Sequence, residues 1–357
     1  MSHYTNYTEA NNFSSDSDAD PSRTDAINER FAPCSHVRQK AVASEYILHV
    51  CGNSQTNPYL AVTLLDNSCE VFDFAQDLTS IARFKGHEKK VVECKFDDSL
   101  LYTGSNDGTI KLWDTRSPEK EAISFVDRTL DATSDPKSIN SFDVSANKRL
   151  LAAGTDLIDG DAFILFWDVR STKLLGGYWE SHTDDITQVR FHPDDSNTLM
   201  SGSTDGLINI YNLVETSEDD ALQQCLNTEK FVDSLTWFDE KGRYRISCVT
   251  STVDLQLWDL DGAEPYARLE RNDIASQIMV KTDDVYVAEV VVGRDHLSIL
   301  VGSKRSLRSL KMTAGAVQRG SRFVENGQRV RCAWYNRDVD FLVTGGESGL
   351  LDVWRLK

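Results

Sequence analysis

Apolar and polar residues alternate along most of this chain in short segments. In Ile110-Lys111-Leu112-Trp113 and again in Ile186 to Phe191, apolar residues recur at every second position. A period of two places successive side chains on opposite faces of a β-strand. Gly, Asp, Asn and Ser residues separate the segments, as hairpin turns require. The pattern therefore predicts an all-β chain built from hairpins.

The alternating segments belong to a repeat whose clearest copy is TGSNDGTIKLWD, Thr103 to Asp114. A unit of this length cannot bury its apolar face alone, so it must stack against other copies of itself. We align the copies on the position that Trp113 occupies and find seven of them. The spacing between neighbours is 41 to 54 residues, close to the ~40–45 residues of a four-stranded propeller blade. The residues at this aligned position are Phe72, Trp113, Trp167, Tyr211, Trp258, Leu310 and Trp354.

The copy that runs from Gly86-His87 to Trp113-Asp114 resembles the repeat of the WD40 β-propeller family. That pattern begins with Gly-His, continues through a Ser/Thr-Gly strand and an Asp-Gly turn, and ends in Trp-Asp. The resemblance covers roughly residues 40 to 357 and implies a seven-bladed β-propeller. The run from Ser181 to Leu213 is similar to the family of WD repeat-containing protein 89, which implies no established biochemical role.

In the WD40 family a His, a Ser or Thr, an Asp and a Trp form a buried hydrogen-bonded network inside each blade. The resemblance therefore implies a structural role for one such set in blade 2 and for another in blade 4. The remaining blades lack the His or the Asp. The blade 2 set is His87, Thr103 or Ser105, Asp107 and Trp113; the blade 4 set is His182, Ser201 or Ser203, Asp205 and Tyr211.

The seventh repeat is short, because the chain stops at Lys357 directly after its third strand. We expect Ser35 to Val42 to supply the fourth strand, which closes the ring and removes an unpaired edge. The alternative is a three-stranded last blade with this segment disordered. The first 34 residues are acidic and low in apolar content, so we expect a disordered tail followed by a propeller over 35–357.

The net charge of −18 is spread unevenly. Between Lys304 and Arg337 there are nine basic residues and a single acidic one, Glu325. Such asymmetry concerns partners rather than fold. This basic sector could bind an acidic segment, an RNA strand or the acidic tail of the same chain, or it could be a solvated face.

The seven cysteines are scattered and form no Cys-x-x-Cys pair, which fits a reducing compartment. The first thirty residues have no apolar core, and no apolar run reaches the ~18 residues of a membrane span. We therefore expect a cytoplasmic or nuclear protein without a membrane partner.

Sequence motifs for catalysis, metal binding and phosphate binding are absent. We expect no catalytic residues, no metal, no cofactor and no enzymatic activity. His87 and His182 each stand at the start of a blade, where the family uses His structurally.

Two further features point to partners. Trp113-Asp114-Thr115-Arg116 and Trp167-Asp168-Val169-Arg170 both have the pattern W-D-x-R, which resembles that of substrate receptors for cullin-type ubiquitin ligases. The simpler interpretation is a local Asp–Arg pair.

Propellers also bind through loops around the channel, where we expect Lys89, Lys90, Asp184 and Asp185 to lie. Three long insertions are also candidates for docking, namely Asp127 to Ser138, Asp156 to Asp161 and Glu215 to Gln224.

The leading hypothesis is a non-enzymatic scaffold that binds a protein or peptide partner through loops at the propeller rim. One alternative is a ubiquitin-ligase substrate receptor that binds its adaptor through Asp114, Arg116, Asp168 and Arg170. Another is binding of RNA or a ribosome precursor through the Lys304–Arg337 sector, although the acidic chain as a whole makes nucleic acid an unfavourable partner.

Overall fold

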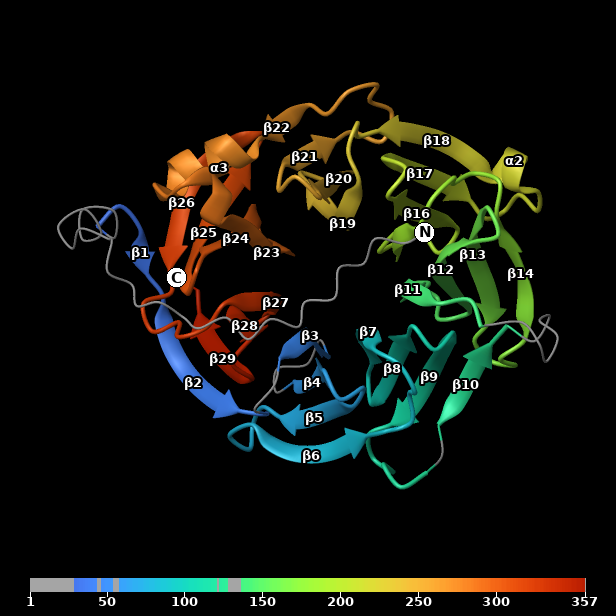
Figure 1. Cartoon of the computed structure of the whole chain (residues 1–357), viewed down its shortest axis with the longest axis horizontal. Coiled ribbons are helices and arrows are strands. Elements are labelled where there is room, and N and C mark those ends of the chain that lie inside the picture. The colour runs from blue at the N-terminus through green and yellow to red at the C-terminus, as the bar shows by residue number, and fades with distance from the viewer. Residues whose placement is uncertain (1–28, 44–45, 54–57, 121, 128–135, 357) are drawn as a thin grey trace.

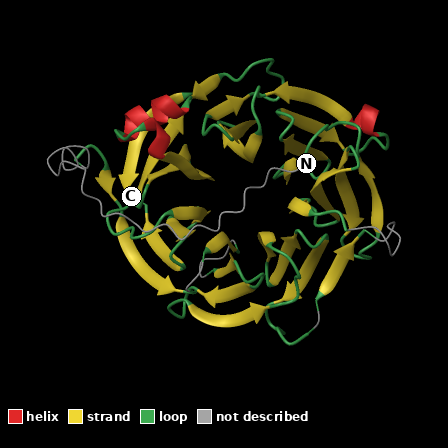
Figure 2. Ribbon diagram, in the orientation of Figure 1, coloured by secondary structure: helices red, strands yellow, loops and turns green. Residues whose placement is uncertain are grey.

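The protein is a ring of seven sheets around a central channel, in a computed structural model (Figure 1); six sheets have four strands and the sheet of blade 6 has five. The structure describes residues 29–356 except 44–45, 54–57, 121 and 128–135. Strands make up almost all of the regular structure, and helices appear only at the periphery (Figure 2). The predicted seven-bladed propeller is confirmed.

Each blade is an antiparallel sheet whose strands follow chain order from the channel outward. Blade 1 consists of β3 (Ile47–Gly52), β4 (Tyr59–Leu64), β5 (Cys69–Asp73) and β6 (Thr79–Phe84), and blade 2 of β7 (Val91–Asp97), β8 (Leu100–Ser105), β9 (Thr109–Asp114) and β10 (Ile123–Val126). Blade 3 consists of β11 (Ile139–Val144), β12 (Leu150–Ile158), β13 (Asp161–Asp168) and β14 (Leu174–Tyr178), and blade 4 of β15 (Ile186–Phe191), β16 (Thr198–Ser203), β17 (Leu207–Asn212) and β18 (Leu222–Asn227).

Blades 5 to 7 follow the same order, with the outer strand of blade 7 supplied from the N-terminal side. Blade 5 consists of β19 (Val232–Glu240), β20 (Arg243–Thr250), β21 (Leu255–Trp258) and β22 (Ala267–Leu269). Blade 6 consists of β23 (Val285–Val292), β24 (Leu297–Ser303), β25 (Ser306–Thr313) and β26 (Ala316–Arg322). Blade 7 consists of β27 (Val330–Asn336), β28 (Phe341–Gly346), β29 (Leu350–Arg355) and β2 (Ser35–Ala41).

This topology gives the ring two distinct faces. The upper face carries the connections between blades and the turns between second and third strands. The lower face carries the turns between first and second strands and the connections between third and fourth strands. On the upper face, Gly108 and Gly206 have φ of 83° and 87°, which glycine adopts without steric cost. A Cβ atom at Gly108 would lie 2.6 Å from Cβ of Pro136.

The ring is closed by β2, which pairs antiparallel with β29 (blue beside red in Figure 1). The expected role of Ser35 to Val42 is therefore confirmed. His36 lies between two carboxylates, with Nδ1 3.0 Å from Glu325 Oε2 and Nε2 3.1 Å from Asp352 Oδ1. Gln39 also donates to Asp352, at 2.8 Å. Polar contacts thus join the first and last strands of the ring in addition to their ladder.

The packed chain begins before residue 35. A short strand β1 (Ala32–Pro33) runs parallel to β26 of blade 6. Phe31 is buried among apolar residues of blades 5 and 6, and the Arg308 guanidinium lies over its ring at 5.5 Å. Residues 29–34, which the sequence analysis assigns to the tail, are thus in place along blade 6. Residues 1–28 lie outside the described residues.

The apolar core consists of seven clusters, each shared by two neighbouring blades. The residue at the aligned Trp position always lies in the cluster shared with the preceding blade, and it is buried in all seven copies. The residue just before it packs toward the next blade. Because each cluster joins two blades, the blades stabilise one another around the ring.

Three short helices interrupt the strands within the described residues. One of them is α2 (Glu218–Ala221), within the insertion Glu215 to Gln224, and the Ser217 side chain accepts a hydrogen bond from Asp220 N. Sequence analysis missed α3 (Arg271–Ile278) and the 3₁₀ turn η1 (Thr282–Asp284) between blades 5 and 6. Ile274, Ala275 and Ile278 of α3 are buried, a spacing that signals one helix face. None of these helices is long and apolar enough to span a membrane.

Candidate interaction surfaces and buried polar networks

The predicted network of blade 2 is present. Trp113 Nε1 donates to Thr103 Oγ1 at 2.8 Å, and Thr103 Oγ1 lies 2.8 Å from His87 Nε2. His87 Nδ1 lies 2.9 Å from Asp107 Oδ2. A carboxylate only accepts, so Nδ1 carries the proton and Nε2 accepts from the threonine hydroxyl. Burial alone would raise the pKa of Asp107, but hydrogen bonds from His87 and Thr109 hold it well below its usual value.

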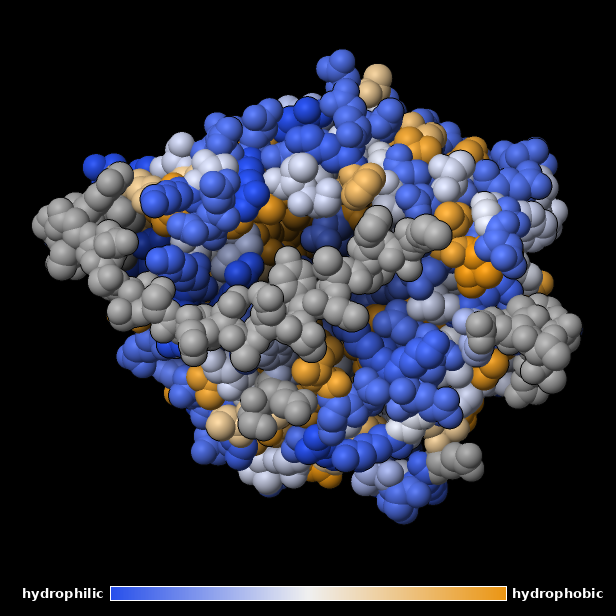
Figure 3. All heavy atoms as spheres, in the orientation of Figure 1, coloured by the Kyte–Doolittle hydropathy of each residue, from blue (hydrophilic) through white to orange (hydrophobic). Residues whose placement is uncertain are grey.

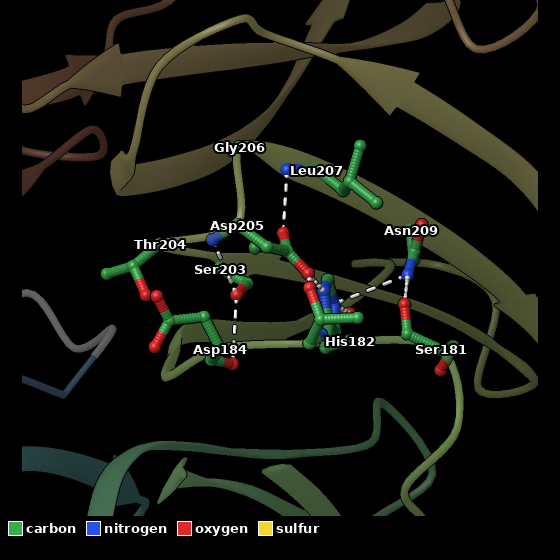
Figure 4. Close-up of polar contacts among 12 residues, drawn as sticks. Ser181, His182, Asp184, Ser203, Thr204, Asp205, Gly206, Leu207 and Asn209 are labelled. Carbon is green, nitrogen blue, oxygen red and sulfur yellow. Dashed lines mark hydrogen bonds and ion pairs between the residues drawn. The ribbon is translucent and has the colours of Figure 1, made fainter. Parts of the chain in front are cut away.

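Blade 4 repeats this arrangement with Tyr211 in place of Trp. Figure 4 shows His182 beside Asp205, with His182 Nδ1 2.9 Å from Asp205 Oδ2. His182 Nε2 lies 2.7 Å from Ser201 Oγ. Tyr211 OH lies 3.3 Å from Ser201 Oγ and 2.8 Å from the Ser181 hydroxyl. These contacts join the inter-blade connection, the second strand and the third strand of one sheet.

Ser105 and Ser203, the alternative members of the two sets, are not in the networks. Ser105 Oγ donates to the Lys89 carbonyl at 3.1 Å and accepts from Asp107 N. Ser203 makes the same two contacts, with the Asp184 carbonyl and Asp205 N. Both serines stand at the last residue of their strand and cap the turn. Thr103 and Ser201 lie two residues earlier, nearer the Trp or Tyr ring.

Two other blades keep part of the network without its His. In blade 7, Trp354 Nε1 donates to Thr344 Oγ1 at 2.9 Å, and Gln328 bonds the Leu350 carbonyl and Asp352. In blade 5, Trp258 Nε1 donates to Gln256 Oε1 at 3.1 Å. A side chain two residues before Trp thus substitutes for the missing partner.

The networks are not arranged for catalysis. Thr103 and Ser201 are fully buried, whereas a serine nucleophile requires an exposed hydroxyl. Within the described ranges, no group of three His, Cys, Asp or Glu side chains could hold a metal. Six cysteines are buried and Cys225 is exposed.

The two W-D-x-R motifs lie on the lower face, at the ends of β9 and β13. Arg116 folds back onto its own Asp114 with two hydrogen bonds of 2.9 Å. These contacts lower the pKa of Asp114 to about 2. In the second copy, only the backbone N of Arg170 bonds Asp168 Oδ1, and the Arg170 side chain is exposed.

The expected rim residues lie on the upper face, in the connections that lead into blades 2 and 4. Lys89 and Lys90 are exposed. Asp185 Oδ1 accepts a hydrogen bond of 2.7 Å from Leu157 N of the β12–β13 hairpin. Burial, followed by the charges of Asp156 and Asp184, raises the pKa of Asp185. Their role in binding stays a prediction.

The hairpin and the connection after β14 also expose apolar side chains. Leu157 is 39% exposed and Trp179 47%. The ring of Trp179 lies 6.5 Å from that of Phe163, and Phe163 N bonds Thr155 Oγ1. The face seen in Figure 3 is mainly hydrophilic with separate hydrophobic spots around the ring.

The basic sector from Lys304 to Arg337 is distributed over several surfaces. Lys304 and Arg305 lie in an upper turn, whereas Arg337 lies in a lower one. Arg308 is buried beside Phe31, and Arg319 Nε donates to the Gln277 carbonyl at 2.8 Å. Arg331 pairs with Glu347 at 2.6 Å. Residues close in sequence therefore do not form one continuous basic patch.

Comparison with known proteins identifies the family. Residues 65–288 match the family model described as nucleolar protein 10-like, N-terminal domain, which is a β-propeller. The chain belongs to this propeller family. WD repeat propellers of this kind are interaction scaffolds that bind protein partners.

Relatives of this propeller family carry WD repeat names. The chain is 28% identical over 214 residues to the WD repeat-containing protein 89 homolog of Dictyostelium discoideum. The aligned residues cover 59% of the chain and 55% of that protein. It is 30% identical over 229 residues to the WD repeat-containing protein GTS1 of Arabidopsis thaliana, covering 61% and 55%. An uncharacterized WD repeat-containing protein of Schizosaccharomyces pombe is 27% identical over 290 residues, covering 74% and 82%.

The resemblance to WD repeat-containing protein 89 is thereby confirmed. The chain spans about half the length of the first two relatives.

Proposed function

We propose that this propeller is a non-enzymatic scaffold that binds a basic segment of a protein partner on the upper face of blades 3 and 4. The observation that carries the proposal is the cluster of Asp156, Asp184 and Asp185. Two separate elements, the β12–β13 hairpin and the connection after β14, bring these carboxylates together through the bond from Leu157 N to Asp185.

The electrostatics of the cluster favour a cationic partner. The carboxylates of Asp156 and Asp184 add to burial in raising the pKa of Asp185, so the three groups repel one another. A Lys or Arg side chain relieves that repulsion. The net charge of −18 further attracts basic partners over distance.

The neighbouring apolar side chains supply anchoring contacts. Leu157, whose backbone N bonds Asp185, is 39% exposed, and Trp179 is 47% exposed in the same connection as Asp184 and Asp185. Aromatic anchors surrounded by polar groups are typical of binding hot spots. The preferred partner is therefore a segment with Lys or Arg residues beside aliphatic or aromatic ones.

The family description suggests where such a partner is met. The matching family is described as nucleolar protein 10-like, which supports our proposal that this protein acts in the nucleus, including the nucleolus, with the cytoplasm as the alternative. An enzymatic role has no support in the buried networks.

Fluorescence anisotropy tests the proposal with labelled peptides that contain Lys, Arg and a Leu or Trp. Changing Asp156, Asp184 and Asp185 together to Asn removes the charge but keeps an oxygen acceptor. We expect binding to weaken about tenfold or more, about 1.4 kcal/mol.

The matched control changes three exposed carboxylates outside the cluster, Asp98, Asp219 and Asp338, to Asn. This control has the same net charge as the triple Asn variant of the cluster and should keep the wild-type affinity. An equal loss in both variants would show a general charge effect and would refute a specific site.

A second candidate function is supported by one observation. Arg116 and Arg170 are both exposed on the lower face of adjacent blades, as docking of a ubiquitin-ligase adaptor requires. The internal pair of Arg116 with Asp114 supports the simpler structural role instead. A pull-down with Arg116→Ala/Arg170→Ala decides between them, because an adaptor bound through these motifs must be lost.

The RNA hypothesis has less support, because the basic residues of its sector lie on different surfaces.

A further inference from the structure

The surface that blade 6 presents to blade 7 is divided into an apolar half and a polar half. In the apolar half, Leu300, Leu307 and Phe323 join Trp354 in one cluster. In the polar half, Ser298 pairs with Lys311 across neighbouring strands, and Ser309 stands two residues from Lys311 on the same strand. Ser321 N donates to Ser309 Oγ at 2.8 Å. These four polar side chains therefore share one side of the sheet.

The polar half is a departure from the repeat. The residue just before the aligned Trp position packs toward the next blade and is apolar in the other six blades, where it is Val71, Leu112, Phe166, Ile210, Leu257 and Val353. Blade 6 has Ser309 at this position. Space that an aliphatic or aromatic side chain fills in the other blades is therefore left open.

The charge at the next position is also reversed. The residue after the aligned Trp position is Asp in four blades, as in Asp114 and Asp168, Asn in blade 4 and Arg355 in blade 7. Blade 6 has Lys311 there, directly beside the open space. Loss of an apolar side chain and gain of a cation coincide at one place.

The result is a cavity of about 180 Å³ between the two blades, with Tyr335, Asp340 and Leu356 on the blade 7 side and Asp295 in its lining on the blade 6 side. Ser298, Ser309 and Ser321 line it, and each is more than nine-tenths buried. Among the described residues, the hydroxyls of Ser298 and Ser321 and the ammonium of Lys311 have no hydrogen-bond or ion-pair partner. The Ser309 hydroxyl accepts from Ser321 N and keeps its proton to donate. These donors lie at the surface of the cavity, so they are available to a ligand with several acceptors.

The acidic groups nearby do not neutralise Lys311. Asp340 already accepts from the Tyr335 hydroxyl at 2.6 Å and pairs with Arg294 at 3.1 Å. Asp295 is exposed at the tip of the adjoining turn. Burial, together with the positive charge of Lys311, lowers the pKa of His296 on that turn.

We propose that this cavity, formed by Ser298, Ser309, Ser321 and Lys311, binds the phosphate group of a phosphomonoester. Three hydroxyls and one ammonium provide donors for a tetrahedral oxyanion, and a charged acceptor strengthens each of these bonds. The groups belong to the lower part of blade 6, so the site is separate from the acidic cluster on the upper face. The phosphate can come from a small molecule or from a phosphorylated side chain of a partner.

Isothermal titration calorimetry with inorganic phosphate, at ionic strength held constant with chloride, tests the site. The wild-type chain should bind phosphate saturably. Lys311→Gln and Ser309→Val should each weaken binding about tenfold or more, since one removes the cation and the other fills the cavity. Ser309→Val restores the residue type of the other blades, so this variant is expected to fold.

The matched control is Lys173→Gln, which removes an exposed lysine from the lower face of blade 3 and should leave the affinity unchanged. Absence of saturable binding, or equal binding by wild type and Ser309→Val, overturns the proposal. Acetate bound as tightly as phosphate overturns it as well.

Two further ligands distinguish the source of the phosphate. A phosphoserine tripeptide that binds about tenfold more tightly than inorganic phosphate assigns the site to a partner's side chain, whereas equal affinities assign it to a small phosphate compound. An unphosphorylated tripeptide that binds equally well contradicts a phosphate site.

Discussion

At the scale of single residues, the polar groups inside the blades hold separate strands together. The network from Trp113 through Thr103 and His87 to Asp107 joins the third strand, the second strand, the inter-blade connection and the turn of blade 2. A buried hydroxyl in the middle of such a network has partners on both sides. Removing it leaves both of them unsatisfied.

Thr103→Val should therefore lower the free energy of unfolding by about 1–3 kcal/mol, because Trp113 Nε1 and His87 lose their shared partner. Ser105→Ala should cost less, about 0.5–1 kcal/mol, because Ser105 bonds only the backbone groups of Lys89 and Asp107 and belongs to no side-chain network. Urea denaturation of both variants measures the difference.

Thr103→Ser keeps the hydroxyl and serves as the control, which should lie nearer to wild type than Thr103→Val. If Ser105→Ala were the more destabilising change, Thr103 would not be the central member of the network.

At the scale of elements, the structure depends on one strand from the opposite end of the chain. The strand β2 completes blade 7, and β1 adds to the outer edge of blade 6. These additions cover strand edges that would otherwise be open to pairing with other chains. The same N-terminal segment also contributes two buried side chains, Phe31 and Cys34, to the apolar core.

Deletion of residues 1–42 should accordingly lower the melting temperature by about 10 °C or more, because the ring loses its closing strand and several buried side chains. Deletion of residues 1–28 alone leaves β1 and β2 in place and should change the melting temperature little. Differential scanning calorimetry compares the two. Equal melting temperatures would contradict the closing role of β2.

The element level also shows how far the sequence can be interpreted. Hairpins, the blade count and the closing strand follow from alternation and from the repeat, because each depends on local pattern. The helix α3 was missed, because its eight residues lie in a connection for which the repeat specifies no structure. The choice between Thr103 and Ser105 depends on which hydroxyl lies nearer the Trp ring, and sequence spacing alone does not determine that.

At the scale of the whole molecule, the ring separates stability from recognition. Seven apolar clusters between blades hold the scaffold, while the upper and lower faces carry different charged groups. The acidic cluster could be predicted in part, since Asp184 and Asp185 follow a blade start. The insertion Asp156 to Asp161 was also a docking candidate, but its contact with Asp185 could not be predicted, because the length of the β12–β13 hairpin brings Leu157 beside the next blade.

The central claim is that partners bind at the acidic upper face of blades 3 and 4. Proximity labelling in intact cells tests it most directly, with the wild-type chain, the Asp156/Asp184/Asp185→Asn variant and the Arg116→Ala/Arg170→Ala variant at equal abundance. We predict that the strongest labelled partners of the wild-type chain contain basic segments. These partners should disappear with the Asn variant and persist with the Ala variant. Persistence with the Asn variant and loss with the Ala variant would contradict the account and locate binding on the lower face.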